Sequence, residues 1–199
     1  GNVKLGAKIF GILSFSFLAY LLLGLLLPGT WEAEVEQVVP APPSRTFSLI
    51  NDLGAWSSWS PMPEAGVSTF GAEEGAGAGL RWDDPRYGQG EVRILKSQAN
   101  RSVEYRVEVE GGKLTILGSI TLDSLPQGTR VRWREEGDFG WNPLLGYAAR
   151  GMQKSQATAM AESLDTLSRI LEEGQEGGLG SSPQESGEVG LENAGGDRA

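Results

Sequence analysis

The first strong pattern along the chain is a run of apolar residues near its beginning. From Ile9 to Leu27, nineteen consecutive residues carry no charge. A helix of that length is about 28 Å long, close to the roughly 30 Å thickness of a bilayer hydrocarbon core. The run is also longer than the roughly 7 to 15 apolar residues of a cleaved signal peptide. We therefore predict one transmembrane anchor helix over residues 5–27.

Charged residues flank this run asymmetrically. Lys4 and Lys8 precede it, acidic residues follow it, and the next basic residue is Arg45. Basic residues next to a membrane span favour the cytoplasmic side. The sequence therefore predicts a single-pass protein of the cell membrane, with its N-terminus in the cytoplasm and the remaining chain on the extracytoplasmic side.

After the apolar run, hydrophobic and polar residues alternate with a period of two. Tyr105 and its apolar neighbours two residues away alternate with Glu and Arg. This alternation is typical of half-buried antiparallel strands, and Gly111-Gly112 and Pro126-Gln-Gly128 supply turns between them. The predicted strands lie near residues 31–39, 66–71, 79–83, 89–97, 103–110, 114–122 and 130–135.

Two segments have helical periodicity instead. A short helix follows Pro42-Pro43-Ser44 and ends at Gly54. A long helix comes last, and its apolar residues recur every three or four positions. A sheet covered by one long terminal helix is an α+β arrangement. The apolar positions of the last helix are Leu145, Ala148, Met152, Met160, Leu164, Leu167 and Leu171.

Composition limits both the extent of the fold and its chemistry. Residues 174–199 are rich in Gly, Ser and Glu and contain no aromatic residue, so we expect a disordered acidic tail. The net charge of −9 argues against binding to nucleic acid. The chain contains no Cys and no His, which excludes thiolate nucleophiles, Ser-His-Asp triads and Cys/His zinc sites. We predict no metal and no cofactor.

The order of several short motifs resembles a known family. "APPSRTFSLINDLGAWSSWSP" is followed by "GAGAGLRW", "GQGEVRI", "GTRVRW" and the long helix. This order resembles the SRPBCC or START-like superfamily, in particular its polyketide cyclase/dehydrase-like branch, over residues 31–173. The resemblance implies a helix-grip fold, in which a curved antiparallel sheet wraps around a long C-terminal helix and encloses a hydrophobic cavity. The anchor and the tail lie outside it.

Inward-facing positions are the candidate ligand contacts. Trp56 and Trp59, in "WSSWSPM", follow the first helix of the predicted domain, and each ring either closes the core or lines a pocket. Gly118 shares a strand face with Ile116 and Ile120 and has no side chain, so we expect open space above it. The candidate ligand-binding residues are Trp59, Trp82, Tyr105, Gly118, Trp133 and Met152, each with core packing as the alternative.

The weaker candidates for catalysis are Glu135 and Tyr105. Glu135 falls in step with Val131 and Trp133, so strict alternation points its carboxylate inward, where burial raises the pKa. A carboxyl group of raised pKa is suited to proton transfer. Alternatively, Glu135 lies close enough to the strand end for its side chain to reach water.

Three arginines on the same predicted strand occupy the opposite face. They alternate with Val131 and Trp133 and therefore point outward. We expect exposed ion pairs with acidic residues of a nearby strand, which join Arg130, Arg132 and Arg134 to Glu104, Glu108 and Glu110.

Three functions are compatible with this sequence. The leading hypothesis is a membrane-tethered domain that binds a hydrophobic small molecule or lipid between the sheet and the last helix. The second is a cyclase- or dehydratase-like enzyme that uses Glu135 or Tyr105. The third is a non-catalytic protein-interaction module of the cell envelope. A binding role is favoured over an enzyme, because the sequence shows no matched pair of acid and base.

Overall fold

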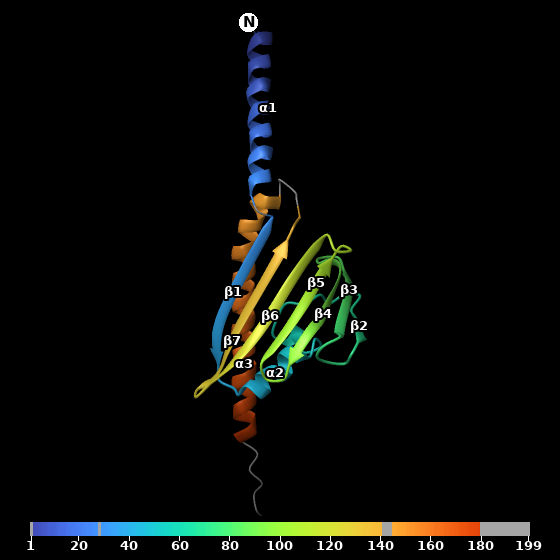
Figure 1. Cartoon of the computed structure of the whole chain (residues 1–199), viewed down its shortest axis with the longest axis vertical. Coiled ribbons are helices and arrows are strands. Elements are labelled where there is room, and N and C mark those ends of the chain that lie inside the picture. Colours follow the sequence, from blue (N-terminus) through green and yellow to red (C-terminus); the bar gives the residue numbers. More distant parts are fainter. Residues whose placement is uncertain (1, 28, 141–144, 180–199) are drawn as a thin grey trace, which may run out of the picture.

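The computed structural model describes residues 2–27, 29–140 and 145–179, and Figure 1 shows one helix that projects from the end of a domain in which a sheet lies beside a second long helix. The structure confirms the predicted α+β helix-grip plan. Its elements are α1 (Asn2–Leu26), β1 (Thr30–Val39), α2 (Pro43–Asn51), the 3₁₀ turn η1 (Trp56–Ser58), β2 (Ser68–Gly71), β3 (Ala78–Asp84), β4 (Gly88–Gln98), β5 (Ser102–Val109), β6 (Leu114–Leu125), β7 (Gly128–Asp138) and α3 (Leu145–Leu179).

The strands form one antiparallel sheet in the order β1-β7-β6-β5-β4-β3-β2. Strands β2 to β7 follow one another as neighbours, and β1 closes the other edge by pairing with β7. Helix α3 runs behind β1 and β7 (Figure 1). The ends of β7, β5 and β3 and the start of α3 lie toward α1, so we call this end of the domain the anchor-side end (Figure 1).

The inner face of the sheet and one stripe of α3 form the core. The period-two pattern is confirmed on β7, where Val131, Trp133 and Glu135 are buried and the residues between them are exposed. On α3, Met152 is half-buried and Ala148 is exposed, so the inward stripe is complete only in the second half of the helix. Its fully buried members are Met160, Leu164, Leu167 and Leu171.

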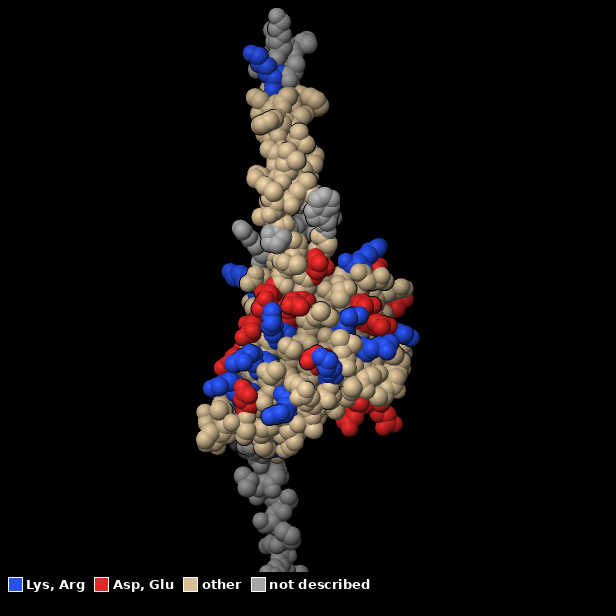
Figure 2. All heavy atoms as spheres, viewed as in Figure 1, with Lys and Arg blue, Asp and Glu red and all other residues tan. Residues whose placement is uncertain are grey.

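The outer face of the sheet carries exposed ion pairs, as predicted, but with different partners. Arg134 bonds Glu32, with 3.0 Å between Nε and Oε1, and Arg132 bonds Glu36. The partners come from β1 because β1, not β5, lies beside β7 in the sheet. The predicted pairing with Glu104, Glu108 and Glu110 is therefore wrong. Figure 2 shows acidic and basic side chains intermixed over this domain.

The tryptophans of "WSSWSPM" fix the end of α2. Trp56 donates its indole N–H to the carbonyl of Ile50 at 3.1 Å, and Trp59 donates its own to the carbonyl of Leu49 at 3.2 Å. The last carbonyls of a helix lack partners within that helix. Both rings therefore act as a buried cap as well as core residues, since each is at most 4% exposed.

Four aromatic residues each lie over a glycine directly opposite on the neighbouring strand. A Cβ added to Gly118 would lie 2.0 Å from Cζ of Tyr105, and one on Gly137 would lie 2.4 Å from the ring of Trp31. A ring that covers a glycine shields the backbone and fills the gap left by the missing side chain. The pairs are Trp31 with Gly137, Phe70 with Gly79, Trp82 with Gly90 and Tyr105 with Gly118.

The two ends of the chain extend beyond the sheet. Within α1, the 19-residue stretch Lys8–Leu26 is long and apolar enough to cross a membrane, a property that anchors share with signal sequences. At the other end, α3 continues to Leu179, so the predicted boundary at residue 174 falls inside a helix. The rest of the predicted tail, residues 180–199, lies outside the described residues.

The packing over Gly118 predicts a penalty for the smallest possible substitution. In Gly118→Ala, the new methyl group meets the ring of Tyr105, which is 1% exposed and held against Trp56. We expect the free energy of unfolding to fall by about 1 to 3 kcal/mol, as in other overpacked cores. Thermal unfolding followed by circular dichroism measures this change.

Gly151→Ala in α3 is the matched control, because nothing lies within 4 Å of its added Cβ. Its free energy of unfolding should stay the same or rise by up to about 1 kcal/mol, because alanine lowers the backbone entropy of the unfolded chain. Equal stability of the two variants would show that the ring of Tyr105 moves aside freely.

Candidate functional site

A hydrogen-bonded polar cluster lies deep between the sheet and α3. Tyr105 on β5 donates its hydroxyl proton to Oε1 of Glu135 on β7, and the same hydroxyl accepts the indole N–H of Trp133 at 2.7 Å. From α3, Nε2 of Gln156 donates to Oε2 of Glu135 at 2.5 Å. Side chains from two strands and one helix therefore converge on a single carboxyl group. We call Tyr105, Trp133, Glu135 and Gln156 the Glu135 cluster.

Burial sets the electrostatics of this cluster. Removal from water raises the pKa of Glu135, and the hydrogen bonds from Tyr105 and Gln156 only partly oppose that rise. The pKa of Tyr105 is raised well above 10.0, first by burial and then by the charge of Glu135. The Tyr105 hydroxyl therefore stays protonated near neutral pH and acts as a hydrogen-bond donor. Glu135 is a carboxyl group whose protonated form the fold favours.

Aromatic rings fill the space around this cluster. The Trp56 ring meets Tyr105 edge-on, with 4.9 Å between centroids, and the Trp59 ring meets Trp133 edge-on at 5.5 Å. The expected open space above Gly118 is absent, because the ring of Tyr105 occupies it. That expectation failed because the strand register, which places Tyr105 opposite Gly118, was not known from the sequence.

Unpaired donors and half-buried apolar side chains lie at the anchor-side end of the interior. The indole N–H groups of Trp31 and Trp82 are buried and find no acceptor among the described residues. Nearby inward positions of β5, β6 and α3 are only half-buried, namely Val107, Ile116 and Met152. A buried N–H group without an acceptor is costly, so these donors suit a water molecule or a ligand oxygen.

The sequence candidates therefore fall into two groups. Tyr105, Trp133 and Glu135 meet in one cluster. Trp82 and Met152 lie apart from it toward the anchor-side end, and Trp59 contacts the cluster only through the ring of Trp133.

Two residues of the site were missed by the sequence analysis. Gln156 was missed because a glutamine on a helix carries no signal of its partner. Trp31 was missed because it stands shortly after the apolar run, although it alternates with Ala33 on the inner face of β1.

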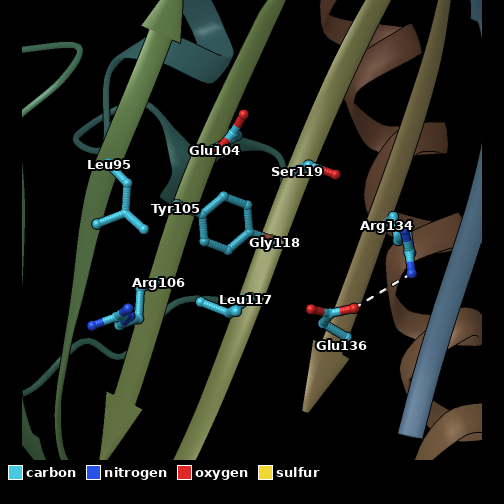
Figure 3. A pocket seen from close by; sticks show the side chains of 9 residues that line it. All are labelled: Leu95, Glu104, Tyr105, Arg106, Leu117, Gly118, Ser119, Arg134 and Glu136. Carbon is cyan, nitrogen blue, oxygen red and sulfur yellow. Dashed lines mark hydrogen bonds and ion pairs between the residues drawn. The ribbon is translucent and has the colours of Figure 1, made fainter.

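A shallow depression on the outer face is a weaker candidate. It has a volume of about 290 Å³ and lies directly behind the cluster, with Gly118 and Tyr105 at its floor (Figure 3). Its arginine Arg134 is already paired with Glu32 and Glu136. Its other charged residues, Glu104 and Arg106, are paired with Lys96 and Glu108. The other lining residues are Leu95, Glu104, Arg106, Leu117 and Ser119.

The raised pKa of Glu135 predicts a pH-dependent stability difference. Below the ordinary value of 4.5, the carboxyl is protonated in both folded and unfolded chains. As the pH rises above 4.5, the unfolded chain loses this proton first, so wild-type stability declines until the raised pKa is passed. Glu135→Gln cannot ionise and avoids this decline. Its melting temperature should therefore rise relative to wild type as the pH increases above 4.5.

Glu136→Gln on the outer face is the control, because an exposed ion pair contributes only about 0 to 1 kcal/mol. The melting temperature of this variant should stay close to that of wild type at every pH. A constant difference between Glu135→Gln and wild type at every pH would mean that water reaches the Glu135 carboxylate.

Comparison with solved structures shows the same fold in other proteins. A protein of unknown function from Staphylococcus aureus has a TM-score of 0.58 at 11% identity, over 75% of this chain and 98% of that one. A putative uncharacterized protein from Rhizobium leguminosarum has a TM-score of 0.52 at 17% identity, over 72% and 95% of the two chains. At these identities the likeness concerns the fold alone.

The di-domain ARO/CYC StfQ from the steffimycin biosynthetic pathway is also similar in fold. The TM-score is 0.56 at 10% identity, and the match covers 74% of this chain and 52% of that chain. A search of curated protein sequences gives no match.

One sequence family matches most of the chain, over residues 30–172. The match begins at the first residue of β1 and ends within α3, so it includes the whole sheet and the Glu135 cluster. A ligand-binding or cyclase-like domain is the role that this fold supports. The chain belongs to the polyketide cyclase / dehydrase and lipid transport family.

Proposed function

We propose that this protein is a membrane-tethered domain that binds an apolar molecule carrying a hydroxyl or carbonyl oxygen. The observation that carries the proposal is the pair of buried indole N–H groups, on Trp31 and Trp82, without acceptors among the described residues. The two rings are 3% and 7% exposed, in an interior lined mostly by apolar side chains. The two donors stand on β1 and β3, with four strands between them. An acceptor oxygen on an apolar ligand satisfies either donor without bringing a charge into the core.

The charges of the interior favour a neutral ligand. Within the described part of the chain, the buried polar residues include Glu135 but no Lys or Arg. A ligand carboxylate would meet the Glu135 carboxyl without a compensating cation, which is unfavourable in a site of low dielectric constant. A protonated Glu135, by contrast, donates to a hydroxyl or carbonyl oxygen.

The anchor-side end is the natural entrance. Val107, Ile116 and Met152 are half-buried there, whereas the inward residues farther along the sheet, such as Ile120, are fully buried. Helix α1 extends from the same end (Figure 1). If α1 spans the membrane, an apolar ligand passes from the lipid to the interior over a short distance. The flanking charges favour the extracytoplasmic side for the domain in this proposal.

Retinol and retinoic acid form a matched probe pair for this proposal, because they share a chain and differ in the charge of one end. The full chain in phosphatidylcholine nanodiscs is titrated with each, and quenching of tryptophan fluorescence is corrected with empty nanodiscs. We expect retinol to bind at least about tenfold more tightly than retinoic acid, which is about 1.4 kcal/mol in binding free energy.

Ile116→Phe and Leu117→Phe form the matched variant pair, since Ile116 faces inward and Leu117 faces outward on the same strand. Ile116→Phe should weaken retinol binding by about tenfold through obstruction of the entrance, and Leu117→Phe should not change it. Equal binding to both variants, or no saturable binding, would contradict the proposal. The absence of saturable binding would favour the protein-interaction alternative, in which the aromatic rings fill the space between the sheet and α3.

A cyclase-like activity is the second candidate, and the direct bond between Tyr105 and Glu135 favours it. An ionised Glu135 is positioned to remove a proton from a carbon next to a carbonyl, and the proton then resides on the carboxyl group. Exchange of solvent deuterium into a long-chain β-diketone tests this activity. Exchange that is faster than in buffer and is lost in both Glu135→Gln and Tyr105→Phe would support it.

A further inference from the structure

A contact between two tyrosines ties α1 to the folded domain. The rings of Tyr20 on α1 and Tyr147 on α3 are stacked, with centroids 4.3 Å apart and planes 5° from parallel. The Tyr147 hydroxyl also donates to the backbone carbonyl of Tyr20 at 2.8 Å. The two helices are therefore held by a stack and a hydrogen bond, which we call the tyrosine clamp.

The position of Tyr20 within α1 sets the depth of the clamp in a membrane that α1 spans. The apolar stretch runs to Leu26, six residues beyond Tyr20, which is about 9 Å along a helix axis. The whole stretch of 19 residues is about 28 Å long and is needed to cross a hydrocarbon core of roughly 30 Å. A ring stacked on Tyr20 therefore lies below the membrane surface defined by Leu26.

The start of α3 is suited to that environment. The chain carries no charged residue from Phe139 to Ala149, and Asp138 and Arg150 bracket this stretch. The Tyr147 hydroxyl, which would be costly to bury unpaired in lipid, is satisfied by the Tyr20 carbonyl. Tyrosine is also enriched at membrane interfaces, where an apolar ring and a polar hydroxyl are both accommodated.

The connection from α1 to β1 is equally short. Only residues 27–29 separate the two elements, and the amide of Phe139 donates to the carbonyl of Gly29 at 3.1 Å. Three residues reach at most about 11 Å. The end of β7 and the start of β1 are therefore held together beside the end of α1.

From this geometry we infer that the first turn of α3 inserts into the lipid bilayer, so that the domain docks on the membrane by its anchor-side end. The partner is the lipid surface of the leaflet that surrounds the end of α1. This inference rests on the membrane anchoring in the proposed function, and it adds a second membrane contact and a fixed orientation to that anchor.

Single-cysteine labelling tests the docking, since the natural chain has no Cys. The fluorophore NBD is attached to the full chain in phosphatidylcholine vesicles through Phe15→Cys in α1, Ala148→Cys in α3 or Gln127→Cys in the β6–β7 turn. All three positions are exposed in the structure. Doxyl groups on lipid chains report contact with lipid, and aqueous iodide reports contact with water.

We expect NBD at position 148 to be quenched by 5-doxyl lipid and to show about fivefold less iodide quenching than NBD at position 127, since ions are excluded from the hydrocarbon. Adding Tyr147→Ala should raise iodide quenching at position 148 while leaving position 127 unchanged. Adding Tyr147→Phe, which keeps the ring but loses the hydrogen bond, should have a smaller effect at position 148.

NBD at position 15 separates the two ways in which this test can fail. If position 15 is quenched by 12-doxyl lipid while position 148 is as open to iodide as position 127, the docking inference is wrong and the anchor stands. If position 15 is itself open to iodide, α1 does not span the bilayer, and the tethering in the proposed function fails as well. Neither result depends on retinol binding, which is measured separately.

Discussion

The interior of this domain depends on the position of one side chain, Tyr105. Its ring covers Gly118 on the next strand and meets the edge of Trp56. Its hydroxyl accepts a hydrogen bond from the indole N–H of Trp133 and donates one to Glu135. A single buried tyrosine therefore links β5, β6, β7 and η1. Because protein cores are close-packed, none of these contacts can change without disturbing the others.

Two of the rings that lie over glycines carry buried donors without acceptors. Trp31 and Trp82 lie over Gly137 and Gly90, and both indole N–H groups lack acceptors within the described residues. The carbonyls of the sheet are already used in the strand ladder, and a buried donor without a partner is costly. Trp133 avoids this cost only because the Tyr105 hydroxyl lies within reach.

Alternation along the strands was enough to predict the sheet and the outward arginines, and it gave the inward direction of Glu135 as one of two alternatives. It could not predict partners that come from distant parts of the chain. The arginines of β7 pair with β1, about 100 residues earlier in sequence, because β1 closes the sheet edge. Gly118 was misjudged for the same reason, since its neighbour across the strands is Tyr105. Gln156 reaches Glu135 through the crossing of α3 over the sheet, which no sequence period encodes.

If α1 crosses a membrane, its position accounts for both the tyrosine clamp and the unpaired indole N–H groups. A hydroxyl in water has no need of a helix carbonyl, whereas in lipid the second lone pair of the Tyr20 carbonyl is one of few acceptors available. The clamp then fixes the orientation of the sheet relative to the bilayer, with the half-buried side chains of Val107 and Ile116 on the membrane side. An apolar ligand that follows this route stays in contact with lipid or protein throughout. The cost of exposing its surface to water, about 25 cal/mol per Å², is thereby avoided along the path.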